Sequence, residues 1–202
     1  VIALDLAGHG RSSHRSMDSS YDIWIDIGEV IAVADQMGWE RFALLGHSRG
    51  AVISGLIAGT FPDRITQVAL IDGYVPRPHD ADSAVKQVKQ AIRESKRFGG
   101  SSPTYFSDFD RAIQARVNGF VPLQLEAATL LASRGVVEGP KGYYWANDQR
   151  LKAASFVKFS KEHLEGFFTA ILARVLLIQA ENSPFSPDRQ QSEFFGWVPH
   201  MQ

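Results

Sequence analysis

Short apolar runs alternate with segments of helical periodicity over the first 73 residues. Three runs, Val1–Leu6, Arg41–Leu45 and Ile65–Ile71, are rich in apolar residues, which is typical of strands buried on both faces of a parallel sheet. Between them, Tyr21–Met37 has apolar residues at helical spacing, and Ala51–Phe61 is a run of small and apolar residues. The alternation predicts an α/β fold, with a mostly parallel sheet and right-handed crossovers.

The pattern changes after residue 73. No strand is indicated from Tyr74 to Ala173, whereas helical periodicity recurs in Asp82–Phe98, Pro122–Ser133 and Glu162–Leu172. We interpret the stretches 101–107 and 135–142 as loops. About a hundred residues of helix between two sheet strands is too long for one crossover, so we expect a helical lid. Strand composition then returns at Arg174–Ala180. The predicted organisation is a first core part at 1–73, a lid at 74–173 and a second core part at 174–202.

Composition narrows the classes of function. Hydrophobic residues make up 45% of the 202 residues and charged residues 21%, which are globular values. Basic residues number 21 and acidic residues 22, for a net charge of −1, so we expect no nucleic-acid partner. The chain has no cysteine, and its six histidines are scattered, so we expect neither a metal site nor a cofactor. No apolar stretch has the length of a membrane span, and nothing in the sequence indicates an oligomeric state.

The strongest chemical signal is a serine between two glycines. Residues 46–50 read Gly-His-Ser-Arg-Gly, between a predicted strand and a small-residue helix. This matches the G-x-S-x-G nucleophile elbow, a sharp turn that exposes the serine hydroxyl at the sheet edge. Side chains two positions before and after the serine would collide in such a turn, so we expect glycine to be required at both Gly46 and Gly50. Ser48 is the predicted nucleophile, and the backbone N–H of Arg49 is the predicted oxyanion donor because the helix dipole favours negative charge.

Further motifs carry a family resemblance. Residues 5–12 read Asp-Leu-Ala-Gly-His-Gly-Arg-Ser and match a D-x-x-G-x-G-x-S loop that lies one strand before the elbow strand in many α/β-hydrolases. We interpret this loop as mainly structural rather than as a source of catalysis from His9 or Ser12. Together with Leu130–Gly135 and Asn147–Leu151, these motifs resemble the serine hydrolase-like proteins, a branch of the α/β-hydrolases. The resemblance covers almost the whole chain and departs at Arg49, where the family often has Phe, Leu, Met or Gln.

The resemblance implies a catalytic triad in the chain order serine, acid, histidine. Three carboxylates could supply the acid. Asp72 ends the strand after the elbow helix, while Glu181 and Asp188 follow the strand at Arg174–Ala180. The later-strand position is weakened because Gln-Ala-Glu-Asn stands where the family places an aspartate after a glycine. We therefore rank Asp72 first and keep Glu181 and Asp188 as alternatives, with turn capping as the competing role of Asp72.

The histidine of the triad is expected beyond Gln202. His200 lies in what reads as the approach to the last strand, His163 lies on a predicted lid helix, and His47 precedes the nucleophile. The resemblance implies that the second oxyanion donor comes from a His-Gly loop after an earlier strand, upstream of Val1. The chain itself opens inside a predicted strand. We therefore expect N-terminal strands and a C-terminal strand outside this chain, and we expect the 202 residues alone to be nearly inactive.

The predicted function is hydrolysis of an ester-like or thioester-like small molecule through an acyl-enzyme on Ser48. Serine at this position argues against epoxide hydrolases and haloalkane dehalogenases, which need a carboxylate nucleophile. A serine-based carbon–carbon hydrolase, a perhydrolase and a non-catalytic binding protein with the same fold are the alternatives. No secretory signal is visible in the sequence, and we expect a cytoplasmic or organellar location, with the peroxisome included.

Overall fold

The computed structural model describes residues 1–181, 183, 192–198 and 200–202. It divides into two compact units, each formed from two stretches of chain. The first unit contains Val1–Tyr21 and Lys89–Phe156, and the second contains Asp22–Val88 and Val157–Gln202. Each unit has its own sheet and its own buried core.

The second unit is built on a parallel three-stranded sheet. Its strands, in the spatial order β1-β2-β6, are β1 (Phe42–His47), β2 (Ile65–Ile71) and β6 (Arg174–Ile178). The register aligns the carboxyl ends of all three, because His47 pairs with Ile71 and Ile71 pairs with Ile178. Met201 forms a parallel bridge to Val175 and extends the sheet beyond β6.

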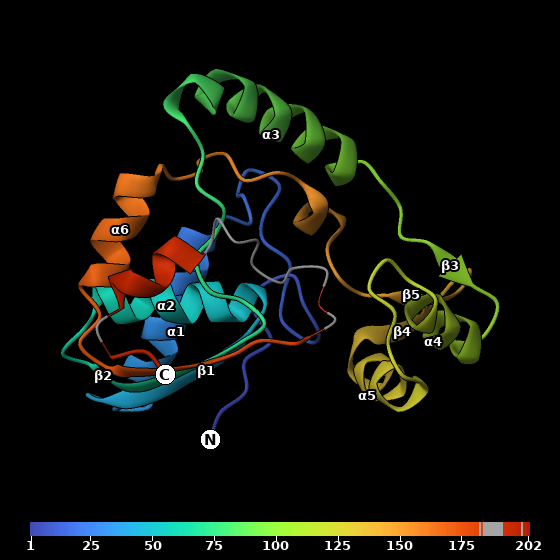
Figure 1. The fold of residues 1–202 in the computed structure, drawn as a ribbon. Coiled ribbons are helices and arrows are strands. Elements are labelled where there is room, and N and C mark those ends of the chain that lie inside the picture. Colours follow the sequence, from blue (N-terminus) through green and yellow to red (C-terminus); the bar gives the residue numbers. More distant parts are fainter. Residues whose placement is uncertain (182, 184–191, 199) are drawn as a thin grey trace. The chain divides into compact units, whose positions relative to one another are not determined.

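Helices of the second unit gather on one side of this sheet (Figure 1). They are α1 (Ile23–Gln36), α2 (Arg49–Thr60), α6 (Lys161–Thr169) and the short 3-10 helices η1 (Ala81–Ser83) and η3 (Ser192–Trp197). α2 packs on β1 and β2 and also contacts α1 and α6. The fully buried core between these layers is aliphatic and aromatic, and its largest members are Phe168, Leu56, Ile57, Leu70 and Leu164. Burial of each such side chain stabilises the unit by about 1.5–3 kcal/mol.

The opposite face of the same sheet is apolar and exposed. Leu45, Leu176 and Ile178 are 73%, 48% and 46% exposed, and the register places Leu45 and Leu176 in one row across β1, β2 and β6. Parallel sheets usually have both faces covered. The chain thus buries one face of its parallel sheet and leaves apolar side chains on the other.

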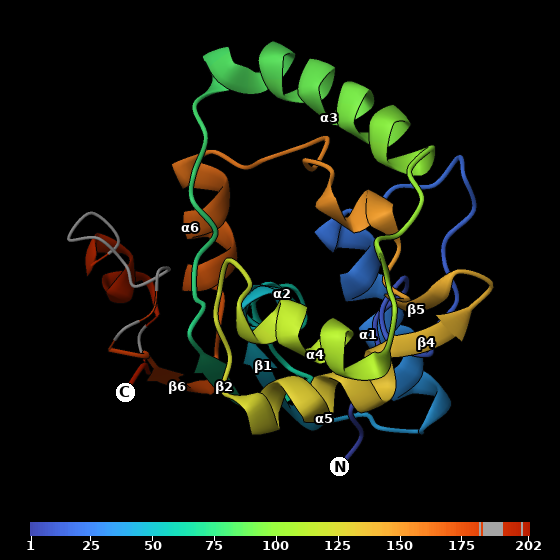
Figure 2. The same ribbon diagram turned by 90° about the vertical axis from the view of Figure 1, so that its right-hand side faces the viewer.

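The first unit combines a small antiparallel sheet with helices (Figure 2). Its strands, in the order β3-β5-β4, are β3 (Tyr105–Phe106), β4 (Val136–Gly139) and β5 (Gly142–Trp145), and its helices are α4 (Phe109–Val117), α5 (Leu125–Gly135) and the 3-10 helix η2 (Gln149–Lys152). α4 packs against α5 around Ile113, Ala128 and Ala132. Trp145 packs on this cluster, and its Nε1–H donates to the Ala112 carbonyl at 3.1 Å. A further helix, α3 (Ala84–Gly99), runs from the second unit into the first.

From residue 21 to residue 73 the structure confirms the predicted order of helix, strand, helix and strand. The helices predicted at Tyr21–Met37 and Ala51–Phe61 are α1 and α2, and the strand predicted at Ile65–Ile71 is β2. All three helices predicted after residue 73 are also present, as α3, α5 and α6. None of the helices in the described part of the chain is long and apolar enough to cross a membrane.

Two predictions about secondary structure are wrong. Val1–Leu6 is not a strand in the structure, because its backbone joins no ladder among the described residues. The stretch from 74 to 173 is not wholly helical, since it holds β3, β4 and β5. The predicted loop at 135–142 is the β4–β5 hairpin with a Pro-Lys connection. Local sequence favours a loop here, because Gly139, Pro140 and Gly142 are turn-forming residues. The boundaries of the two compact units also differ from those of the lid predicted at 74–173. The lid itself stays a prediction.

Candidate active site

Ser48 lies in a strained turn between β1 and α2. Its backbone has φ 52° and ψ −117°, a conformation that costs a non-glycine residue about 1–3 kcal/mol. The Ser48 N–H donates to the Ile71 carbonyl at 2.9 Å, and its own carbonyl accepts the Ala51 N–H at 3.0 Å. The turn is therefore tied to the end of β2 on one side and to the first turn of α2 on the other.

Close backbone contacts explain one of the two glycines of the motif. A Cβ atom on Gly46 would overlap the carbonyl group of Gly50, so Gly46 is required. A Cβ atom on Gly50 would meet nothing within 4 Å. The expectation that both positions require glycine is therefore wrong for Gly50, because the second residue of α2 directs its Cβ into open space. Gly73 is the unpredicted requirement, since a Cβ there would lie 2.5 Å from the Ser48 carbonyl oxygen.

Asp72 directly follows β2 and is a second residue with a positive φ. Its φ is 48°, and among the described residues only Ser48 and Asp72 combine a positive φ with a side chain. The Asp72 N–H donates to the Ile178 carbonyl at 2.8 Å. Its carboxylate accepts the Ser183 hydroxyl at 2.6 Å through Oδ2 and the Ala180 N–H at 3.5 Å through Oδ1. Asp72 is thus fixed between the ends of β2 and β6.

The sheet register brings Ser48 and Asp72 to the same edge. They follow His47 and Ile71, which are paired neighbours on β1 and β2. The alternative acid Glu181 is exposed. Asp188 lies outside the described residues. The geometry therefore favours Asp72 as the carboxylate partner of Ser48, and that role stays a prediction.

Arg49, the departure from the family pattern, has its charge compensated within the second unit. Its guanidinium forms an ion pair with Asp26, in the first turn of α1, at 2.5 Å. The Asp26 side chain is only 3% exposed, whereas that of Arg49 is 40% exposed. A buried carboxylate needs such a partner. The pair therefore neutralises Arg49 and links α1 to the start of α2.

Two histidines of the second unit, His200 and His163, make contacts that do not involve Ser48. The His200 carbonyl accepts the Val175 N–H at 3.1 Å, which places His200 beside the amino end of β6. At about 3.3 Å per residue, that point is roughly 10 Å along β6 from the edge that bears Ser48. His163 lies on α6, where its Nδ1 is 2.9 Å from the Ser160 hydroxyl and its ring stacks on Phe159. This geometry agrees with the interpretation of His200 as preceding the last strand.

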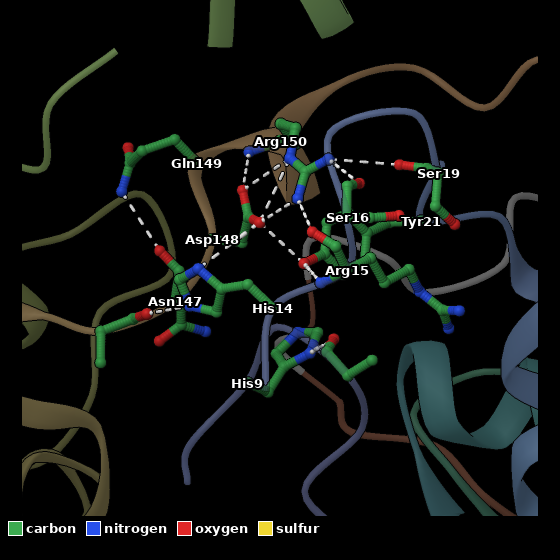
Figure 3. Close-up of polar contacts among 12 residues, drawn as sticks. His9, His14, Arg15, Ser16, Ser19, Tyr21, Asn147, Asp148, Gln149 and Arg150 are labelled. Carbon is green, nitrogen blue, oxygen red and sulfur yellow. Dashed lines mark hydrogen bonds and ion pairs between the residues drawn. The ribbon is translucent and has the colours of Figure 1, made fainter. Parts of the chain in front are cut away.

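The first unit contains a different polar group, which we call the Asp148–Arg150 cluster (Figure 3). Arg150 is only 7% exposed and Asp148 only 8%. The two side chains form an ion pair at 2.7 Å. The remaining guanidinium N–H groups donate to the backbone carbonyls of Arg15, Ser16 and Ser19. The Asn-Asp-Gln-Arg run thus binds the segment at 15–19 to the segment at 147–150.

Hydrogen bonds hold Asp148 in its ionised form. Its carboxylate also accepts the Tyr21 hydroxyl at 2.7 Å and the Arg150 backbone N–H at 2.9 Å. Burial alone would raise the pKa of Asp148, but these bonds and the side chain of Arg150 outweigh it and lower the pKa to about 2. The ring of His14 adds a bond from Nε2 to the Ala146 carbonyl at 2.8 Å. Each guanidinium nitrogen of Arg150 and both carboxylate oxygens of Asp148 take part in hydrogen bonds. The cluster therefore has a structural role, which is to hold two segments of the chain together.

The upstream D-x-x-G-x-G-x-S loop is held by its own residues. The Asp5 carboxylate accepts the Arg11 N–H at 3.1 Å and pairs with Arg134 at 2.6 Å. The Ser12 hydroxyl donates to the Asp5 carbonyl at 2.6 Å, and a Cβ on Gly10 would overlap the Asp5 carboxyl group. These contacts give the motif a structural role within the first unit.

Comparison with known proteins agrees with this architecture. A family model described as the alpha/beta hydrolase fold matches residues 1–202. Human serine hydrolase-like protein 2 is 28% identical over 197 residues, which cover 95% of this chain and 63% of the relative. A probable serine hydrolase of Drosophila melanogaster is 27% identical and covers 89% of this chain and 56% of the relative. The chain thus spans less than two thirds of the length of these relatives.

Solved structures show the same fold. A hypothetical protein from Pseudomonas aeruginosa PAO1 superposes with a TM-score of 0.91 at 35% identity, over 98% of this chain and 70% of that one. The thioesterase domain from the curacin biosynthetic pathway superposes with a TM-score of 0.82 at 21% identity, over 98% of this chain and 70% of that one. With the family match over its whole length and with relatives named serine hydrolase-like, this chain belongs to the α/β-hydrolase fold family.

Proposed function

We propose that this chain carries the nucleophile and the acid of a serine hydrolase. The substrate class is an ester-like or thioester-like small molecule, and the reaction passes through an acyl-enzyme on Ser48. The single observation that carries the proposal is the pair of strained residues at neighbouring strand ends, Ser48 and Asp72. Strain of this kind tends to gather at functional sites, where surrounding structure enforces it.

Each step of the reaction has a group assigned to it. A histidine base, which follows the acid in the family order, takes the proton of the Ser48 hydroxyl while Oγ attacks the acyl carbon. Asp72 orients that histidine and stabilises its protonated form. Negative charge on the acyl oxygen develops near the start of α2, where Arg49 is the first residue and the helix dipole favours an anion.

The second half of the reaction regenerates the serine. The histidine returns its proton to the leaving alcohol or thiol as the bond from the acyl carbon to that group breaks. Water then attacks the acyl-enzyme with the same base, which releases the acid and restores the Ser48 hydroxyl. The Asp26–Arg49 pair keeps the added positive charge at the elbow compensated throughout.

The experiment uses the full-length protein that contains this chain. A fluorophosphonate probe should form one adduct on Ser48, located by peptide mass spectrometry, and p-nitrophenyl esters and acyl thioesters should be hydrolysed. In Ser48→Ala both the adduct and the hydrolysis should fall by at least about 10³-fold, without a loss of thermal stability. Hydrolysis that persists in Ser48→Ala would refute the proposal. Absence of the adduct in the folded protein would favour a non-catalytic binding protein instead.

A further inference from the structure

Ser183 makes a short hydrogen bond to the proposed acid. Its hydroxyl donates to Asp72 Oδ2 at 2.6 Å, and the Ala180 N–H approaches the other oxygen, Oδ1, at 3.5 Å. A hydroxyl bond to an ionised carboxylate at this distance is among the stronger side-chain hydrogen bonds. Ser183 is half-buried and lies in the segment that follows β6, so two separate strand ends meet at one carboxylate.

We infer that Ser183 is a positioning residue for the acid, an inference that rests on the proposed function. The Asp72 side chain projects from a left-handed backbone, and its carboxyl group rotates freely unless a partner fixes it. Ser183 fixes Oδ2. An ionised carboxylate has about four acceptor positions, so Oδ1 keeps capacity for a histidine N–H. The bond therefore selects the rotamer in which Oδ1 serves the base.

Asp72 is held on its main chain as well as on its side chain. The N–H of Asp72 donates to Ile178, and the absence of a Cβ at Gly73 lets that backbone lie against Ser48. The backbone contacts fix where the side chain begins, and Ser183 fixes how the carboxylate is turned. Losing Ser183 should therefore misdirect the carboxylate without moving β2 or the elbow.

A purely structural role is the competing explanation, because a serine at a strand exit often stabilises a turn. The chain offers a matched control for it. The Ser160 hydroxyl donates to Glu162 Oε2, also at 2.6 Å, on the exposed first turn of α6. Ser160→Ala removes a bond of the same type and length, together with the contact to His163 Nδ1, from the same unit. Ser160 is not part of the proposed catalytic machinery.

The test measures the rate of ester hydrolysis and of fluorophosphonate acylation in the full-length protein. Ser183→Ala should lower kcat about tenfold, with KM within about twofold and the melting temperature within a few degrees. Ser183→Thr, which keeps the hydroxyl, should stay within about threefold of the parent, and Ser160→Ala should match the parent.

A double-mutant cycle separates positioning from structure. Asp72→Asn should lower kcat about 10³–10⁴-fold. Adding Ser183→Ala to this variant should not lower kcat further, because the carboxylate that Ser183 orients is already lost. An unchanged kcat in Ser183→Ala would overturn the inference, and so would a full tenfold loss in the Asp72→Asn background. Both outcomes are independent of Ser48→Ala, which alone decides whether the protein is a serine hydrolase.

Discussion

The sheet edge of the second unit and the Asp148–Arg150 cluster of the first unit hold polar residues in opposite ways. At the sheet edge, Ser48 and Asp72 adopt positive φ angles and remain half-exposed. In the cluster, Asp148 and Arg150 are buried, they are bonded to each other at 2.7 Å and neither has a positive φ. The sheet edge thus has a strained backbone and partly exposed polar side chains, whereas the polar side chains of the cluster are buried and hydrogen-bonded.

This contrast distinguishes the proposed catalytic site from a group with a structural role. A strained and accessible hydroxyl costs stability and persists because neighbouring backbone enforces it. A buried, fully paired carboxylate and guanidinium rigidify the segments they join. The Asn-Asp-Gln-Arg run is a specific part of the family resemblance, but its contacts make it a tie between two segments rather than a site of chemistry.

The largest expected effect on stability comes from breaking the cluster. Arg150→Met leaves Asp148 buried without its cation and should lower the free energy of unfolding by about 3–5 kcal/mol. Urea denaturation monitored by far-ultraviolet circular dichroism would measure this loss. Lys152→Met, which removes the charge of an exposed residue two positions on, should stay within about 0.5 kcal/mol. Equal losses in the two variants would contradict the structural role of the cluster.

A smaller effect on the free energy of unfolding should follow when the pH is lowered. The pKa of Asp148 is about 2 in the folded protein against 3.8 for the free group, and a lowered pKa stabilises the ionised, folded form. This stabilisation, about 2 kcal/mol, is fully present above pH 4 and is lost as the pH falls toward 2. Asp148→Asn should therefore show a shallower loss of stability between pH 4 and pH 2. Parallel pH profiles for the two proteins would show that the carboxylate is not held as described.

The smallest expected effect is an increase in the free energy of unfolding, and it concerns the turn that contains Ser48. Ser48→Gly places the residue that best tolerates φ 52° and ψ −117° in the strained turn. The free energy of unfolding should rise by about 1 kcal/mol, while fluorophosphonate labelling disappears. Ser54→Gly, in the interior of α2, serves as the control and should lower stability by about 1 kcal/mol. A Ser48→Gly protein that is less stable than its parent would show that the turn is not strained.

Local sequence carried enough information to predict the parallel core. Small residues after Ser48 and an apolar run before it predict a strand and a helix on either side of a sharp turn, because both elements are set by neighbours in the chain. The antiparallel strands β4 and β5 are not predicted by the sequence, because their local pattern does not resemble a strand. The run Val-Val-Glu-Gly-Pro-Lys-Gly-Tyr-Tyr-Trp at 136–145 has few alternating positions and several turn residues, so local pattern favours a loop and pairing across the hairpin decides otherwise.

Sequence alone determined the type of fold and predicted Ser48 as the nucleophile, since a glycine-flanked serine between a strand and a helix is a local pattern. Tertiary structure decided what local pattern does not encode. It decided that Gly73, and not Gly50, is the second position where a Cβ would collide with backbone. It also paired Arg49 with Asp26 and brought Ser183 to Asp72. Each of these depends on which strand ends and helices meet in space, and residues up to 111 positions apart in the chain become neighbours only when the sheet forms.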